Sequence, residues 1–239
     1  MSMTIVVPVF NEEDNIERLS GVLAEYRKSA SVPVKVLFVD DGSTDKSLEK
    51  IKSACRRLGF DYIAFESNRG LSGAIKAGID CAATEWIGYI DADLQTTPFD
   101  FEKLLPYRDR YEAVVGYRAD RKDGWAKRIQ SKIGNAVRRK LIGDGIIDTG
   151  CPLKIVRADV AKRLPFFDGM HRFIPALVQL EGGRVRQVPV RHFERVAGES
   201  KFNLFNRSIR PVQDLFAYRW MRSRTIRYNI AERSEGACG

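Results

Sequence analysis

The first half of the chain alternates short apolar runs with amphipathic segments, and this alternation is what most limits the possible folds. The runs 5–7 and 36–39 are continuously apolar, which is typical of strands that are buried on both faces. Such strands occur in parallel sheets covered by helices, so the pattern predicts an α/β fold with a mostly parallel sheet flanked by helices. The predicted strands and helices are, in order, 4–9, 15–28, 34–40, 47–58, 62–66, 72–82 and 86–91.

The second half has a looser pattern. We expect, in order, a strand over 112–117, a loop over 118–124, a basic helix over 125–141, a turn over 148–151, a helix over 158–164 and a strand over 185–190. These elements would complete one domain over residues 1–205, followed by a C-terminal helix and tail over 206–239.

The C-terminal helix is predicted to begin near Pro211, because proline is accepted in the first turn of a helix. Its apolar stripe comprises Val212, Leu215, Phe216 and Trp220, and the arginines around it are Arg210, Arg219, Arg222, Arg224 and Arg227. Two interpretations stay open: the stripe packs on the domain, or the basic amphipathic helix lies in a membrane interface.

The formal charge of +9 is concentrated near the C-terminus, because residues 184–228 hold eleven Lys and Arg against three acidic residues. Such a block suits nucleic acid, an anionic membrane or an anionic substrate. No run approaches the roughly 20 apolar residues that span a bilayer, and residues 1–10 do not resemble a secretory signal. Four cysteines without paired spacing predict free thiols in a reducing compartment, so we expect a cytoplasmic protein.

Polar motifs follow three of the predicted strands, at 8–12, 40–43 and 91–95. In open parallel sheets, ligands bind beyond the carboxyl ends of the strands, so the coincidence of the three motifs predicts a site there. In the last motif, Asp91, Asp93 and Gln95 offer hard oxygen ligands for Mg²⁺ or Mn²⁺, cations that commonly bind substrate phosphates as well. The alternative is that the acidic residues only cap the turn after a strand.

Other motifs offer further contacts to a nucleotide and to phosphates. The acidic pair Asp40 and Asp41 can orient a nucleobase or ribose, and the segment 68–74 supplies glycines and a cation near a helix start. The candidate phosphate contacts are Arg118, Arg128, Ser131, Arg195, Ser200 and Lys201. Neither histidine has a neighbourhood typical of a metal site or a nucleophilic triad, so we interpret both as structural or substrate-positioning.

Together the motifs resemble those of family 2 glycosyltransferases with the GT-A fold, which is Rossmann-like, and specifically the polyprenyl-phosphate branch similar to dolichyl-phosphate mannose synthase. The motifs that carry the resemblance lie, in the family's order, at 7–12, 39–43, 70–74, 91–95 and 198–201. The segments 148–151 and 169–173 are similar to a bacterial subgroup in which sugars other than mannose occur.

The resemblance implies a role for each residue that matches. It places Pro8, Phe10, Glu12, Asp40, Asp41, Asp91 and Ala92 at the nucleotide, Asp91, Asp93 and Gln95 at the divalent metal and diphosphate, and Arg118, Arg128, Ser131 and Arg195 at phosphates, with Lys201 assisting. It assigns catalysis to Asp93 together with the residues that contact phosphates.

The implied reaction is metal-dependent transfer of a sugar, with inversion, from a UDP- or GDP-linked donor to undecaprenyl or dolichyl phosphate. The lipid phosphate is already ionised at neutral pH, so no strong base is required. The Glu-Asp and Gln-x-x-Arg-Trp motifs of polysaccharide-forming relatives are missing between 148 and 227.

Members of this branch often continue into membrane helices. We expect this chain to attach at the cytoplasmic face through a surface helix on an anionic membrane or through a membrane partner protein. Two alternatives stay open: transfer to a soluble or polysaccharide hydroxyl, and a non-enzymatic basic module that binds nucleic acid or lipid. The leading hypothesis assigns no nucleic-acid partner, because phosphate and membrane contacts account for the basic segment.

Overall fold

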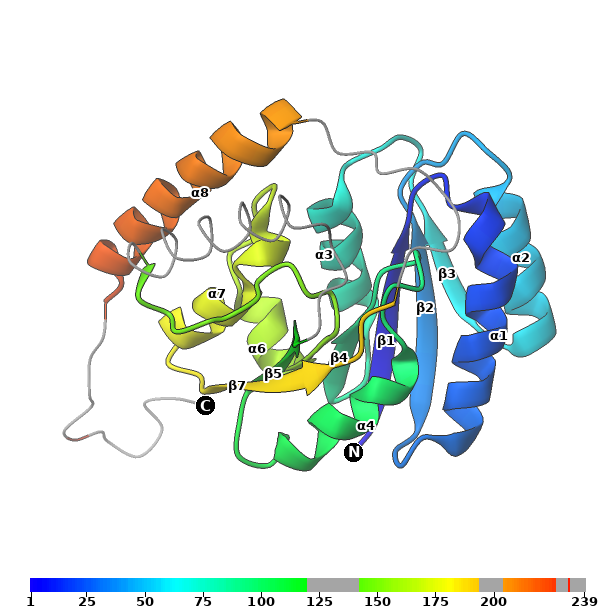
Figure 1. The fold of residues 1–239 in the computed structure, drawn as a ribbon, viewed down its shortest axis with the longest axis horizontal. Coiled ribbons are helices and arrows are strands. Elements are labelled where there is room, and N and C mark those ends of the chain that lie inside the picture. The colour runs from blue at the N-terminus through cyan, green and yellow to red at the C-terminus, as the bar shows by residue number, and fades with distance from the viewer. Residues whose placement is uncertain (120–141, 194–203, 227–231, 233–239) are drawn as a thin grey trace.

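The computed structural model describes residues 1–119, 142–193, 204–226 and 232, and in the last helix it describes side chains from Gln213 onward. These residues form a seven-stranded sheet in the order β3-β2-β1-β4-β6-β5-β7 (Figure 1). The strands are β1 (Met3–Val9), β2 (Val34–Asp40), β3 (Asp61–Ala64), β4 (Trp86–Tyr89), β5 (Ala113–Arg118), β6 (Lys154–Arg157) and β7 (Val185–Val190). Neighbouring strands are parallel except for β6, which is antiparallel to β4 and β5. The predicted class, α/β with a mostly parallel sheet, is confirmed.

Helices cover both faces of the sheet (Figure 1). They are α1 (Glu13–Ser29), α2 (Ser47–Leu58), α3 (Leu71–Cys81), α4 (Phe101–Leu104), α6 (Ala158–Arg163), α7 (Ile174–Leu180) and α8 (Leu204–Arg224), with 3-10 turns at Pro98–Asp100, Leu105–Tyr107 and Met170–Arg172. Alternate residues of β1 serve the two faces: Ile5 packs in the core that contains α1 and α4, whereas Val6 packs in the core that contains α3, α6 and α7. Each such buried side chain contributes about 1.5–3 kcal/mol.

Strand β6 was not predicted from the sequence. This strand has only four residues, begins with Lys154 and ends with Arg157, so it lacks the apolar pattern of a buried strand. It forms because Ile155 and Val156 are buried between β4 and β5. Tertiary packing here overrides a weak local signal.

The C-terminal helix differs from its prediction in two respects. It begins at Leu204, so the predicted start near Pro211 is wrong. The predicted single stripe is also wrong: Leu215 is 8% exposed, whereas Phe216 and Trp220 are 62% and 64% exposed. The inward face of the helix is completed by Tyr218, whose hydroxyl donates to the Ala176 carbonyl at 3.0 Å. One face of α8 therefore packs on the domain, and a second, aromatic face points outward.

Several predictions lie outside the described residues, among them the helix over 125–141 and most of the loop before it. The division of the chain after residue 205 stays a prediction. Within the described part, no helix is long and apolar enough to cross a membrane.

Candidate active site

The loops that follow β1 and β2 are joined at the carboxyl edge of the sheet. Val9 and Asp40 end the two strands in register, and the Asp41 N–H donates to the Val9 carbonyl at 2.8 Å. The Ser43 hydroxyl accepts a hydrogen bond from the Asn11 N–H at 2.9 Å. The first two polar motifs therefore share one edge, as the sequence predicts.

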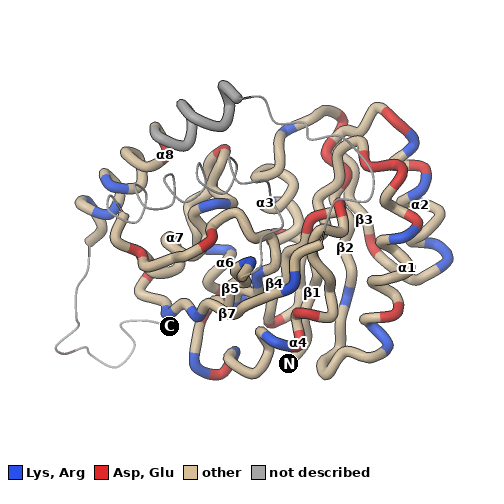
Figure 2. Tube along the Cα trace, in the orientation of Figure 1, with Lys and Arg blue, Asp and Glu red and all other residues tan. Residues whose placement is uncertain are grey.

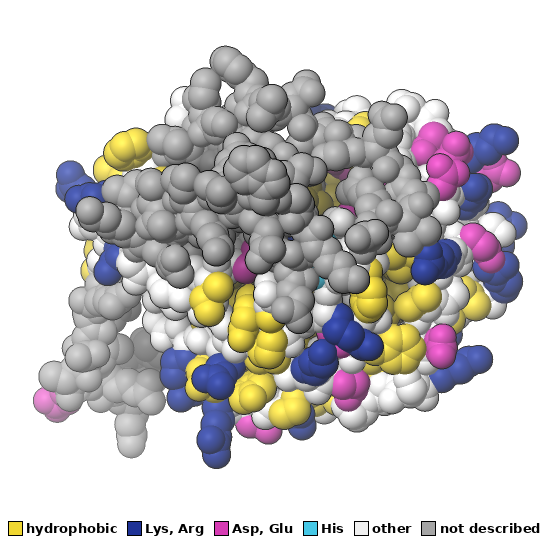
Figure 3. All heavy atoms as spheres, viewed as in Figure 1, with side chains coloured by type: hydrophobic (Ala, Val, Ile, Leu, Met, Phe, Trp, Pro, Cys, Tyr) yellow, Lys and Arg dark blue, Asp and Glu magenta, His cyan; other side chains and the backbone are white. Residues whose placement is uncertain are grey.

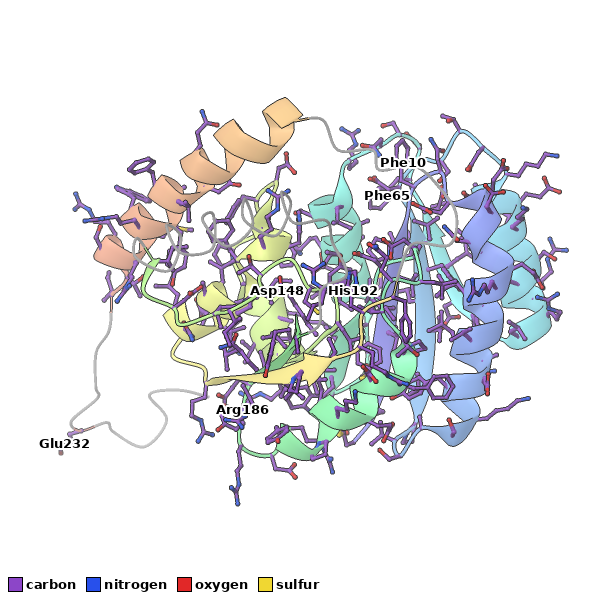
Figure 4. The ribbon with its side chains drawn as sticks, in the orientation of Figure 1. Phe10, Phe65, Asp148, Arg186, His192 and Glu232 are labelled. Carbon is purple, nitrogen blue, oxygen red and sulfur yellow. The ribbon has the colours of Figure 1, made fainter. Side chains whose placement is uncertain are left out.

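Asp40 is buried at this edge, and its two carboxylate oxygens differ in their hydrogen bonding. It is 1% exposed, and its Oδ2 accepts from the Ser43 N–H at 3.1 Å. Among the described residues, its Oδ1 has no hydrogen-bond partner. A buried carboxylate oxygen is costly unless a donor reaches it, so the site suits a ligand that brings an N–H or O–H group. Figure 4 shows Phe10 and Phe65, which follow β1 and β3, at the same edge; Phe65 was not singled out from the sequence.

Asp41 has both carboxylate oxygens engaged within the protein. Oδ1 accepts from the Arg69 N–H at 2.7 Å, and Oδ2 accepts from the Asn68 side chain at 2.9 Å. Burial raises the pKa of this carboxyl above its ordinary value. Asp41 therefore ties the loop before α3 to the loop after β2, and its predicted contact with a nucleotide remains a prediction.

Gly42 allows these two loops to approach each other. Its φ is +68°, and a Cβ atom there would lie 2.6 Å from the Ser67 carbonyl carbon and 2.7 Å from the Asn68 nitrogen. Both are backbone atoms, so no side-chain rotation relieves the clash. We expect Gly42→Ala to lower the free energy of unfolding by about 2–4 kcal/mol, as measured by denaturant unfolding.

Gly59 provides the matched control for this prediction. It also has a positive φ, +64°, but nothing lies within 4 Å of the position that a Cβ atom would take there. Gly59→Ala should therefore cost only the left-handed backbone term, about 1 kcal/mol. Equal losses at the two positions would contradict the close approach at Gly42.

Each of the two carboxylates in the acidic turn after β4 accepts a hydrogen bond from within the protein. The Tyr89 hydroxyl donates to Asp91 Oδ1, and Asp93 Oδ1 accepts from the Gln95 N–H at 3.1 Å. Burial and the neighbouring charge of Asp93 raise the pKa of Asp91 to about 6. Leu94 has a φ of +57°, a strained conformation that is concentrated at functional sites.

This turn suits a divalent cation that is shared with a substrate. Within the described residues there is no group of three or more His, Cys, Asp or Glu that could hold a metal. Mg²⁺ and Mn²⁺ do not require one, because one or two carboxylates, waters and substrate phosphates complete their coordination. Asp91 and Asp93 provide hard oxygens whose mutual repulsion a cation would relieve, so the residues fit such an ion. Roles for Gln95 and Ala92 stay predictions.

Arg118, at the end of β5, forms a bidentate ion pair with Asp148. Its Nε and Nη2 donate to the two carboxylate oxygens at 2.7 and 2.9 Å, and the two side chains are 12% and 7% exposed. From the sequence, Asp148 was interpreted as part of a turn and of a segment similar to a bacterial subgroup, without a role of its own, and Figure 4 shows it near the middle of the molecule. No local sequence signal indicates this pairing, because Arg118 and Asp148 are 30 residues apart in the chain.

The chain that leaves β7 is anchored beside the acidic turn. Asp100 is 1% exposed and accepts from the Arg191 N–H at 2.7 Å and from its Nε at 2.8 Å. The Phe193 N–H donates to the Gln95 carbonyl at 2.9 Å. Strand β7 and the described residues after it are therefore tied to the acidic turn at Gln95. The remaining candidate phosphate contacts, Arg128, Ser131, Arg195, Ser200 and Lys201, lie outside the described residues.

Some basic residues of the C-terminal segment lie away from this edge. Arg184 is 3.7 Å from a Glu112 carboxylate oxygen, and Arg186 lies over the Tyr107 ring at 5.2 Å. Figure 2 shows acidic residues gathered at the loops above β1, β2 and β3, and Figure 4 shows Arg186 at the other end of the sheet. The surplus of positive charge is therefore only partly available to a substrate at the carboxyl edge.

The glycine-rich segment before α3 contacts the segment 169–173. Ser72 Oγ accepts from the Gly169 N–H at 3.1 Å and lies 3.0 Å from His171 Nδ1. Burial lowers the pKa of His171 to about 3, so the ring is neutral and shares a hydrogen bond with the Ser72 hydroxyl. His171 thus holds two motif segments together, in agreement with a structural or positioning role.

Comparison with known proteins adds evidence from sequence. The sequence profile of the family described as "Glycosyl transferase family 2" matches residues 4–164. A dodecaprenyl-phosphate galacturonate synthase of Rhizobium johnstonii is 34% identical over 224 residues, which are 91% of this chain and 66% of the relative. An undecaprenyl-phosphate 4-deoxy-4-formamido-L-arabinose transferase of Edwardsiella ictaluri is 33% identical over 205 residues, which are 84% of this chain and 63% of the relative. The chain thus spans just under two thirds of these relatives' length.

Solved structures share the fold. Glucosyl-3-phosphoglycerate synthase from Mycobacterium tuberculosis, in complex with phosphoglyceric acid, superposes with a TM-score of 0.68 at 16% identity, covering 92% of this chain and 79% of that one. The same enzyme in complex with Mn²⁺ and UDP-glucose gives a TM-score of 0.65 at 16% identity, covering 91% and 78%. These likenesses agree with the predicted GT-A fold.

Proposed function

Because the chain belongs to glycosyl transferase family 2, we propose that it transfers a sugar, with inversion, from a nucleoside-diphosphate donor to a polyprenyl phosphate. The donor carrier is UDP or GDP, and the acceptor is undecaprenyl or dolichyl phosphate. The observation that carries the proposal is that, at one sheet edge, Asp40 has a carboxylate oxygen without a partner among the described residues, while the carboxylates of Asp91 and Asp93 follow β4, which like β2 pairs with β1. The names of the two bacterial relatives, both polyprenyl-phosphate sugar enzymes, support the acceptor class.

In this proposal one set of residues contacts the nucleotide and another binds the metal. Asp40 accepts a hydrogen bond from the nucleobase or ribose, with Pro8, Phe10 and Glu12 beside it. Asp91 and Asp93 would hold Mg²⁺ or Mn²⁺, and the metal, when bound, would supply positive charge that stabilises the departing diphosphate.

Arginines orient the acceptor. Arg118, held by Asp148, and Arg128, Ser131, Arg195 and Lys201 contact phosphate oxygens and align the lipid phosphate behind the anomeric carbon. An in-line attack from that side displaces the diphosphate with inversion. The attacking oxygen is already ionised, so no side chain needs to remove a proton.

Thermal stabilisation tests the donor half of this proposal. The full chain is heated with UDP, GDP and their sugars, each with Mn²⁺, with Mg²⁺ and with EDTA. A ligand that binds only the native state raises the melting temperature, so we expect one nucleotide series to give a metal-dependent rise. The absence of a rise with every nucleotide would contradict the proposal.

We also propose that the outward face of α8 contacts an anionic membrane at the cytoplasmic side. Phe216 and Trp220 lie one turn apart and are mostly exposed, and Arg219 and Arg224 beside them are exposed as well. Figure 3 shows hydrophobic side chains on the outer surface over α8, next to basic ones. Aromatic and basic residues on one exposed helix face suit the headgroup region, where the acceptor phosphate would be presented. A membrane partner protein on the same face is the other outcome.

The double variant Phe216→Ser/Trp220→Ser tests this contact. We expect its binding to vesicles with anionic lipid to fall about tenfold to hundredfold, because each ring buries apolar area in the interface. Sedimentation with the vesicles measures the binding. Tyr62→Ser, which removes an aromatic residue 43% exposed on β3, is the matched control. Unchanged binding of the double variant would contradict the membrane contact.

A further inference from the structure

A lysine is buried beneath the acidic turn. Lys154 begins β6, is 2% exposed, and lies in register with Tyr89 of β4 on one side and Val115 of β5 on the other. Its Nζ donates to the Cys151 carbonyl and lies 5.3 Å from the centre of the Tyr89 ring. The ammonium group is therefore enclosed, with a carbonyl and an aromatic face as neighbours.

Stability alone does not account for this lysine. Burying an ammonium group is costly, and an apolar residue of similar volume at such a position is often neutral or stabilising. A buried charge that lowers stability is best explained by a function at the neighbouring site. Lys154 is electrostatically coupled to Asp91 and Asp148, both of which lie at that site.

Tyr89 connects this lysine to the acidic turn. The ring of Tyr89 faces the Lys154 ammonium, and the hydroxyl at its far end donates to Asp91 Oδ1. A cation beside the ring makes the hydroxyl a stronger donor and holds the ring in place. The bond also engages one carboxylate oxygen, which fixes the direction of the other.

We propose that Tyr89 and Lys154 are positioning residues that orient Asp91 for the divalent cation, with Lys154 acting through Tyr89. The inference rests on the proposed function, in which Asp91 and Asp93 bind the metal. Residues that hydrogen-bond to a metal-binding carboxylate typically contribute 10- to 100-fold in metal affinity or activity. Arg118, whose charge also acts on Asp91, is itself held by Asp148 through its Nε and Nη2.

Direct measurement of Mn²⁺ binding tests the inference. The full chain and its variants are titrated with Mn²⁺ in the presence of UDP or GDP, and free Mn²⁺ is followed by electron paramagnetic resonance. Tyr89→Phe and Lys154→Met should each weaken Mn²⁺ binding by about 10- to 100-fold. Lys154→Met should melt at or above the wild-type temperature, and Lys154→Arg should recover part of the lost affinity because it keeps the charge.

Two comparisons make the test specific. Tyr26→Phe removes another buried tyrosine hydroxyl that is bonded to a carboxylate, that of Glu102 at 3.0 Å, and it should leave Mn²⁺ binding unchanged. In the double variant Tyr89→Phe/Lys154→Met, the loss should not exceed that of the larger single variant by more than about threefold, because the two residues act in series.

The possible failures are distinguishable. Normal Mn²⁺ affinity in Tyr89→Phe and Lys154→Met, with loss in Asp93→Ala, would overturn this inference alone. If the losses of Mn²⁺ affinity in the two single variants multiply in the double variant, Lys154 does not act through Tyr89. Unchanged Mn²⁺ binding in Asp93→Ala would instead remove the metal site of the proposed function, and with it the basis of this inference.

Discussion

Asp93→Asn should lower sugar transfer to polyprenyl phosphate by about 10²–10³-fold or more while the protein stays folded. The carboxylate is 7% exposed and its charge acts on Asp91, and in the proposed site these two carboxylates hold the cation. Loss of electrostatic stabilisation of a departing group typically costs a factor of this size. Asp93→Ala should remove transfer completely.

The same substitution should not destabilise the protein in the absence of metal. Removing one of the two carboxylates relieves the repulsion that contributes to the raised pKa of Asp91, so the melting temperature should stay level or rise. Asp80→Asn, which removes an exposed carboxylate paired with Lys76 on α3, serves as the control for transfer and should retain it. Normal turnover in folded Asp93→Asn protein would contradict the mechanism.

Arg118→Met should destabilise the protein by about 3–5 kcal/mol, because it removes the guanidinium that neutralises the buried Asp148 carboxylate. For a chain of this size, each kcal/mol shifts the melting temperature by about 2–4 °C. We therefore expect a fall of roughly 6–20 °C in a calorimetric scan, together with a strong loss of transfer.

Asp148→Asn separates the contribution of the ion pair to stability from the role of Arg118 in transfer. It removes the anion but keeps the guanidinium, so it should lower stability by a similar amount and retain more transfer than Arg118→Met does. The double variant should lose less stability than the single variants combined, because each single variant already removes the same ion pair. Additive losses would show that the two side chains do not depend on each other.

Much of the fold follows from local sequence patterns. The runs 5–7 and 36–39 are continuously apolar because β1 and β2 are covered on both faces, and the polar residues that follow them lie at the carboxyl edge because parallel strands end together. The predicted membership of family 2 is confirmed by the family match. The combination of motifs predicted the family, whereas each motif alone was also compatible with a capped turn.

What the sequence could not provide depends on cross-strand geometry. Tyr89 and Lys154 are neighbours only because β6 runs antiparallel to β4, and β6 has no pattern that predicts it. Local sequence also could not show that Asp40 keeps an oxygen without a partner among the described residues while Asp41 does not, since Asn68 and Arg69 come from another loop. In α8, the helical period alone did not decide which aromatic residues face inward.

The most direct test of the proposed function is a transfer assay on the full chain with radiolabelled UDP- and GDP-linked sugars and undecaprenyl phosphate in detergent, with Mn²⁺ or EDTA. We predict a lipid-linked sugar phosphate from one donor series, formed only with the metal and only with the phosphorylated lipid. Transfer that proceeds equally well to a soluble hydroxyl acceptor without lipid phosphate, or no transfer from any donor, would contradict it.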